Sequence, residues 1–368
     1  MDNYKLIFSN PKIILSDNKS DLNNFKEAID YIMDTFMSNR EERDIKIYLV
    51  DNVEDLNIFE NIIKPLVNYY LELLGPEKYA SLIPYFSLFI ETNKTVYTQE
   101  QLEFLKNNGV FLVQVISTMP SVDYLALLAQ IYPGANIKFL INENNVSNLF
   151  ELISTFCSGG FYNLSFDIDW ENYSSPDFSI IEQQLTQYKD FIINAFENYT
   201  VPPVALNFEN ALCKLIITHS EQQNDNYRTS AISSFSCREG TGSLGDYIIK
   251  NNNIYLNKYC MDNNTFKIGG VYDDIDFTII DSIRYTENYS YDMCNNCYLN
   301  RICNNGNPGI NYMFEQSYNK MNTAYCQWQN LIVSLCYEII KHFDIDQNNG
   351  LFKTYFTGIA QRGIRVEY

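Results

Sequence analysis

Four cysteines in the C-terminal third of the chain have the spacing of a metal-binding set. Cys294, Cys297 and Cys303 follow the pattern Cys-x2-Cys-x5-Cys, and Cys326 follows after 22 intervening residues. Two thiolates three positions apart can converge on one metal centre, and a distant fourth completes a tetrahedral set of sulfurs. Spacing alone therefore predicts either a structural zinc ion or one [4Fe-4S] cluster. Thiols that merely pack in a core are a third interpretation, but Asn, Gly and Tyr crowd these cysteines.

The other five of the nine cysteines form no such set. Cys237 and Cys260 are separated by 22 residues. Two thiolates alone make a poor metal site, so this pair either ligates a second centre with further donors or packs in the reduced state. Cys336, Cys157 and Cys213 lie in apolar stretches, which predicts core packing.

Few other residues could do acid-base chemistry. The only histidines, His219 and His342, each border an apolar segment, which favours structural or surface roles. Asp167 and Asp169 alternate at the end of an expected strand and would share one of its faces. Such a strand end can line a binding site or simply be solvated. No nucleophile, base and orienting group occur together, so we predict no catalytic residues.

The first 200 residues are expected to position these groups on repeated βα units. Short β-branched and aromatic runs alternate with amphipathic stretches of helical period, the pattern of a parallel sheet with connecting helices. The expected strands are residues 12–16, 45–50, 87–91, 111–116, 137–141 and 162–168. The expected helices are residues 21–38, 55–74, 98–107, 121–132, 147–156 and 178–195. This predicts an α/β fold of six βα units, either a partial (βα)6 TIM-like barrel or a similar open sheet.

The pattern breaks near a Pro-Pro pair at 202–203, and residues 204–220 are expected to form a strand or a connector. The predicted domains are residues 1–200, a partial barrel; 201–236, a connector; 237–340, a small cysteine-rich domain; and 341–368, a C-terminal tail. Residues 330–343 have a strong apolar helical period.

Composition excludes several classes of partner. The formal net charge of −19 repels phosphate groups, which argues against nucleic acid and anionic membranes as partners. No stretch approaches the length of a membrane span. The N-terminal residues lack the basic and apolar regions of a signal peptide, so we expect a cytoplasmic protein.

The stretch from Cys237 to Cys326 resembles the SPASM domain, the auxiliary iron-sulfur module of radical S-adenosylmethionine (AdoMet) enzymes that modify peptides. The resemblance lies in CREGTGSL, YLNKYC and CNNCYLNRIC, together with the final cysteine. It implies that Cys294, Cys297, Cys303 and Cys326 bind one [4Fe-4S] cluster, with zinc as the alternative. A first auxiliary cluster would also need a cysteine at position 307, which is Asn307. Cys237 and Cys260 are thus expected to be the remnant of a lost site.

The N-terminal half resembles the radical AdoMet partial barrel through the stretch SLFIETNKTVYTQEQLEFLKNNGVFLVQVIS. Two family features are missing. No cysteine precedes Cys157, so the Cys-x3-Cys-x2-Cys loop that would hold the AdoMet cluster is absent. The family's Gly-Gly-Glu-Pro motif, which meets the amino group of AdoMet, is replaced by DNVE at 51–54. The resemblance therefore implies a degenerate member that binds no AdoMet.

These features predict a non-catalytic accessory protein in the maturation of a ribosomally synthesised peptide. It would bind the precursor peptide, an active radical AdoMet maturase or both, and so would work in a hetero-oligomer. The alternative is an electron-transfer subunit that delivers electrons to a partner radical AdoMet enzyme.

Overall fold

A computed structural model describes residues 10–362, except 17, 40–43, 54, 56, 76–84, 224–246, 262, 265, 289–293, 295–296, 298, 300–301, 304–305, 319 and 345–349. The chain forms two compact units, each built from separate segments. Unit 1 contains residues 1–114, 238–290 and 307–320, and unit 2 contains residues 115–237, 291–306 and 321–368. The four cysteines of the predicted metal centre all belong to unit 2.

Unit 1 contains a mixed sheet in the order β4-β3-β2-β1-β7-β8-β9. Strands β1 to β4 pair in parallel, and β7 pairs in parallel with β1. Strands β8 and β9 add two antiparallel pairings, β7 with β8 and β8 with β9. The bounds are β1 Lys12–Ile14, β2 Ile45–Asp51, β3 Phe86–Thr92, β4 Phe111–Ile116, β7 Ile248–Lys250, β8 Asn253–Tyr255 and β9 Lys267–Gly270.

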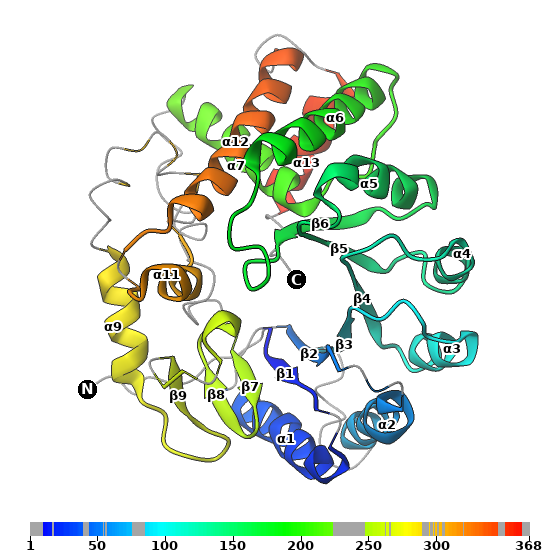
Figure 1. Cartoon of the computed structure of the whole chain (residues 1–368), viewed down its shortest axis with the longest axis vertical. Coiled ribbons are helices and arrows are strands. Elements are labelled where there is room, and N and C mark those ends of the chain that lie inside the picture. Colours follow the sequence, from blue (N-terminus) through cyan, green and yellow to red (C-terminus); the bar gives the residue numbers. More distant parts are fainter. Residues whose placement is uncertain are drawn as a thin grey trace. The chain divides into compact units, whose positions relative to one another are not determined.

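Helices α1, α2 and α3 lie along one side of the parallel strands of unit 1 (Figure 1). An edge-to-face contact between Phe36 of α1 and Phe86 of β3 marks this buried layer. A π-helical turn, η2 (Phe59–Ile63), precedes α2 directly. The bounds are α1 Leu22–Asn39, α2 Lys64–Leu73, α3 Gln99–Asn107, α9 Phe277–Asn288 and α11 Pro308–Glu315, with the 3-10 turns η1 Lys19–Asp21 and η5 Lys258–Cys260.

Unit 2 combines the parallel pair of β5 and β6 with a group of helices. Helix α12 packs against α6 and α7, and α13 packs against α7 (Figure 1). The bounds are β5 Asn136–Ile141, β6 Asn163–Ile168, α4 Val122–Ile131, α5 Leu149–Ser158, α6 Phe178–Glu197, α7 Leu206–Gln223, α12 Thr323–Phe343 and α13 Leu351–Arg362, with the 3-10 turn η4 Val146–Asn148.

The six expected strands and six expected helices up to residue 197 are all present, with ends that differ by a few residues. The start of α3 has a capping box, in which Thr98 and Gln101 bond each other's backbone N–H groups. The apolar period at 330–343 is helix α12, and Cys336 is buried there as expected. The sequence therefore predicts an α/β fold with a parallel sheet correctly.

The expectation of a strand or connector at 204–220 was wrong, because residues 206–223 form helix α7. Its β-branched and aromatic residues suggested extended structure. However, Phe208, Leu212 and Ile216 recur every four residues and are buried. Neighbouring helices cover this apolar stripe, and tertiary packing outweighs the weak local preference. The division into domains at 200 and 236 stays a prediction.

Within the described part of the chain, no helix is long and apolar enough to cross a membrane.

Candidate metal centre

Two successive turns bring the first three cysteines of the predicted set together. The N–H of Cys297 donates to the carbonyl of Cys294 at 3.1 Å, which closes the first turn. The N–H groups of Ile302 and Cys303 both donate to the carbonyl of Leu299 at 2.8 Å, which closes the second. The Cys-x2-Cys-x5-Cys spacing is thus folded by the backbone itself.

The fourth cysteine lies in the first turn of α12. Asn322 caps this helix, because its side chain accepts from the N–H of Tyr325 at 2.9 Å, and the N–H of Cys326 donates to the carbonyl of Asn322 at 3.2 Å. A helix N-terminus carries a partial positive charge, which favours a nearby thiolate. The tyrosine ring also packs on Trp170, with centroids 5.9 Å apart, so the start of α12 is held against the segment after β6.

The pKa of Cys326 is raised by burial and by the other three thiols of the predicted set. Burial is the largest cause that raises the pKa of Cys326 to about 11, and charge repulsion from the thiols of Cys303, Cys294 and Cys297 contributes to the same rise. Cys294 is buried, Cys303 and Cys326 are half-buried, and Cys297 is exposed. The site therefore has one side toward the protein and one toward solvent.

The four cysteines are the right kind of donor for a four-thiolate metal centre, but their side chains are not arranged around a common point in this structure. In the ranges that the structure describes, no three His, Cys, Asp or Glu side chains are arranged to hold a metal ion. Four neighbouring thiols repel one another when ionised, and a bound cation would reverse that repulsion. The chemistry of the donor set thus suits zinc or a [4Fe-4S] cluster, and the thiols would have to move closer together around either one.

The cysteine segment is supported by two contacts, neither of which the sequence alone indicated. Lys214 of α7 donates from Nζ to the carbonyl of Ile302 at 3.1 Å, and the N–H of Leu299 donates to Sγ of Cys297 at 3.4 Å. N–H groups that bond cluster sulfurs tune reduction potentials in iron-sulfur proteins. The lysine contact joins positions 88 residues apart, so no local pattern reveals it.

At the expected remnant of a second metal site, the described residues form a helix cap and an amide–amide hydrogen bond. Cys237 lies outside the described residues, and Cys260 ends η5 with a side chain that is not described. Asn307 is buried and caps α11, where its Oδ1 accepts from the N–H groups of Gly309 at 3.0 Å and Ile310 at 3.2 Å. The same oxygen accepts from Nδ2 of Asn257 at 2.9 Å. Asn307 therefore forms a buried amide–amide pair with Asn257 in unit 1.

Close packing fixes this amide pair. Oδ1 of Asn257 accepts from the N–H of Tyr259 at 2.9 Å, so both ends of its side chain are bonded. A Cβ added at Gly309 would overlap the Asn257 amide, so only glycine fits at that position. The start of α11 and the segment before η5 are thus held together by hydrogen bonds.

A second polar group lies at the carboxyl ends of β2, β3 and β4 in unit 1. Asp51, Thr92 and Gln114 are register neighbours on these strands, and all three are fully buried. Nζ of Lys94 lies 3.2 Å from Oδ1 of Asp51, and the Tyr97 hydroxyl donates to Oδ2 at 2.7 Å. Parallel sheets bind ligands at this edge, but here the carboxylate pairs with groups of the chain itself.

The other acid-base candidates do not form one site. Asp167 pairs with Lys138 at 3.5 Å, whereas Asp169 accepts from the backbone and side-chain N–H groups of Asn172. His342 contacts Glu197 at 2.8 Å on the exposed ends of α12 and α6. The side chain of His219 is not described. Nothing in these contacts assembles the parts of a catalytic site.

Comparison with protein-family models and with curated proteins gives no match. Several solved structures do share the fold. The chain is similar to native anSMEcpe with bound AdoMet, with a TM-score of 0.62 and 14% identity over 96% of this chain and 99% of that one. For native anSMEcpe with bound AdoMet and Cp18Cys peptide, the TM-score is 0.60 and the identity is 12%, over 96% of this chain and 99% of that one. For Streptococcus suis SuiB bound to precursor peptide SuiA, the TM-score is 0.56 and the identity is 13%, over 87% of this chain and 76% of that one.

AdoMet is bound in both of these anSMEcpe structures. No cysteine precedes Cys157, so the first βα connection has no thiolates for a cluster. The carboxylate at the end of β2 is already paired with Lys94, which leaves it unsuited to the amino group of a ligand. The end of β2 thus carries a buried carboxylate that is paired with side chains of the same unit.

Proposed function

We propose that the chain is a catalytically inactive, radical AdoMet-like accessory protein with a partial barrel and a SPASM-like domain. It would act in the maturation of a ribosomally synthesised peptide, in the cytoplasm and within a hetero-oligomer. The single observation that carries the proposal is the shared fold of neighbours that bind AdoMet and peptides, in a chain whose own AdoMet-binding groups are missing. The protein would then bind the precursor peptide, an active maturase or both.

We propose further that Cys294, Cys297, Cys303 and Cys326 hold one [4Fe-4S] cluster. Four protein thiolates leave no open iron for a substrate, so the cluster would serve mainly to hold the cysteine segment against α12. Zinc in the same four-thiolate site is the alternative. Cys237 and Cys260 are proposed to bind no metal.

One observation favours the electron-transfer alternative. Cys297 is exposed, so a cluster bound there would lie close to the protein surface. A surface cluster could pass one electron to the radical site of a partner enzyme. The accessory and electron-transfer roles differ in one measurable quantity, the reduction of the partner's cluster by the reduced protein.

Metal analysis tests the site. Anaerobic iron, sulfide and zinc assays of Cys297→Ala and Cys326→Ala should show loss of the metal and of the brown chromophore. Cys336→Ala is the matched control, because this buried cysteine lies on the same helix as Cys326. It should keep its metal, as should Cys237→Ala. Equal loss from all four variants would disprove the assignment of ligands.

Binding measurements test the role. The full chain should bind a fluorescent precursor peptide or the active maturase in an anaerobic titration. It should also fail to cleave AdoMet under reducing conditions. A titration that shows no binding to either partner would refute the accessory function, whereas AdoMet cleavage would refute the claim of inactivity.

A further inference from the structure

The peptide group that joins Ile302 to Cys303 is hydrogen-bonded on both sides. Its N–H, which belongs to Cys303, donates to the carbonyl of Leu299 at 2.8 Å. Its carbonyl, which belongs to Ile302, accepts from Nζ of Lys214 at 3.1 Å. The first bond is local, whereas the second comes from helix α7, 88 positions away along the chain. A lysine of another element therefore fixes the backbone directly before the third cysteine of the set.

Helix α7 also supports the helix that carries the fourth cysteine. Helix α12 packs against α7 (Figure 1), and Sγ of Cys336 donates to the carbonyl of Phe208 at 3.6 Å. Both of these residues are fully buried, so the two helices are in close contact there. Cys326 lies in the first turn of α12. Within unit 2, helix α7 thus holds Cys326 through α12 and Cys303 through Lys214.

The charge of Lys214 matters because an occupied centre would be an anion. Four thiolates outweigh the positive charge of an iron-sulfur core, and net charge is one of the quantities that set the reduction potential of a cluster. The chain itself has a formal net charge of −19, which adds to the repulsion. Lys214 is half-buried, so its ammonium is screened less than that of a lysine in free solvent. Bonded beside Cys303, it offsets part of the negative charge of the centre.

We propose that Lys214 is a positioning residue of the four-cysteine centre, and that its ammonium raises the reduction potential of the cluster. The bond to Ile302 fixes Cys303 relative to α7, and therefore relative to Cys326 at the start of α12. The positive charge favours the reduced cluster, which carries one more electron than the oxidised one. This inference rests on the [4Fe-4S] centre proposed above and adds to it a group that is not a ligand.

The test compares full-length variants that are purified without oxygen. Lys214→Met removes the ammonium but keeps a side chain of similar length. An iron chelator should remove iron from this variant about tenfold faster than from the wild type, the usual scale for loss of a group that supports metal ligands. The reduction potential, measured by anaerobic dye titration, should be more negative than that of the wild type. Lys214→Arg keeps a cation and a donor, so both quantities should stay closer to their wild-type values.

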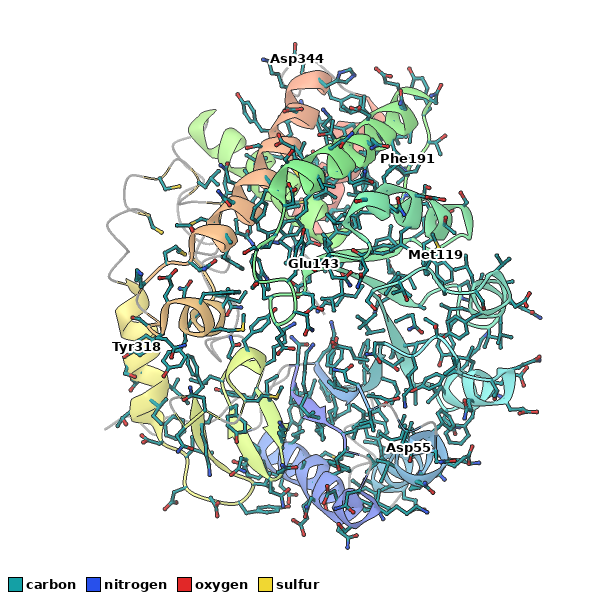
Figure 2. The ribbon with its side chains drawn as sticks, viewed as in Figure 1. Asp55, Met119, Glu143, Phe191, Tyr318 and Asp344 are labelled. Carbon is teal, nitrogen blue, oxygen red and sulfur yellow. The ribbon has the colours of Figure 1, made fainter. Side chains whose placement is uncertain are left out.

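Lys341→Met is the matched control, because it removes the same charge from the opposite end of α12. This helix ends at Asp344, which Figure 2 labels. Lys341 is exposed, and the helix segment between Cys326 and Lys341 is about 22 Å long. Charges are largely screened beyond about 8 Å at physiological ionic strength. The control should therefore match the wild type in iron release and in reduction potential.

The outcomes separate this inference from the proposal on which it rests. A wild type that holds zinc or no metal would refute the proposed [4Fe-4S] centre, and this inference with it. A wild type that holds the cluster, together with a Lys214→Met variant of unchanged potential, would overturn this inference alone. That remains true if iron release is faster, because a purely structural role predicts faster release without a change in potential.

Lys214→Gln is the second variant if Lys214→Met does not fold. It removes the charge but keeps a side-chain N–H donor for the carbonyl of Ile302. Its reduction potential should also be more negative than that of the wild type, and an unchanged potential would contradict the role of the ammonium.

Discussion

The buried amide pair at Asn307 allows a stability prediction worked from its contacts. Replacing Asn307 with Ala removes the oxygen that caps α11 and the acceptor for Nδ2 of Asn257. Loss of an N-cap costs about 1 kcal/mol. Asn257 is 3% exposed, and leaving its donor without this acceptor adds about 1–3 kcal/mol. The expected loss in the free energy of unfolding of unit 1 is therefore about 2–4 kcal/mol.

Hydrogen exchange is the appropriate assay, because a chain with two units need not unfold in one step. Exchange of the α11 amides, followed by mass spectrometry, reports the opening free energy of this part of unit 1. Asn307→Asp keeps the acceptor and the cap, and it should lose less than about 1 kcal/mol. Asn18→Ala is a matched control, because it removes an exposed cap that accepts from the N–H of Ser20 at 3.2 Å.

Two results would refute this reasoning. A loss in Asn307→Ala no greater than that of a cap alone would mean that the pair with Asn257 contributes nothing. The variant Asn307→Cys restores the cysteine that the SPASM resemblance implies at this position. It should be destabilised like the alanine variant and should gain no iron, so a rise in bound iron would show that the second metal site is still competent.

Two further predictions concern unit 2. Burial raises the pKa of Cys157 from 9.0 to about 12, so its alkylation by iodoacetamide at pH 8 should be about 1000-fold slower than in urea-unfolded protein. Because the pKa of Cys157 is raised in the native state, this thiol stabilises the folded state below about pH 9, and that contribution is lost as the pH rises toward 12. A labelling rate within about tenfold of the rate in unfolded protein would contradict the burial of Cys157. Asn207 bonds both the N–H and the carbonyl of Phe166 at 2.7 and 3.1 Å. Asn207→Ala should lower the stability of unit 2 by about 2 kcal/mol in urea unfolding, and Asn207→Asp, which cannot donate to that carbonyl, should recover little of it.

The local elements were predictable from sequence because each depends on near neighbours. Helical and strand periods are properties of consecutive residues, so the six βα units are visible without tertiary information. The capping box at Thr98 is likewise a pattern of four residues. Helix α7 was missed because its β-branched residues favour a strand locally, while the helices packed against it favour a helix.

The cysteine set was predictable as a candidate for a related reason. Three of its members lie within ten residues, and the turns that join them are local. Sequence spacing could not indicate that Lys214 would support this segment, because the contact spans 88 positions. The absence of any cysteine before Cys157 was likewise visible in the sequence.

The two buried polar pairs of unit 1 were decided by the tertiary structure. The pairing of Lys94 with Asp51 spans 43 residues and exists because parallel pairing aligns the ends of β2 and β3. The pairing of Asn257 with Asn307 spans 50 residues and depends on a glycine that lets two segments approach closely. The sequence by itself determined the spacing of the cysteines and the local elements, since both depend on residues that are close together along the chain. Only the fold determined which buried polar side chains pair with each other, since burial and ion pairing depend on neighbours that are distant along the chain.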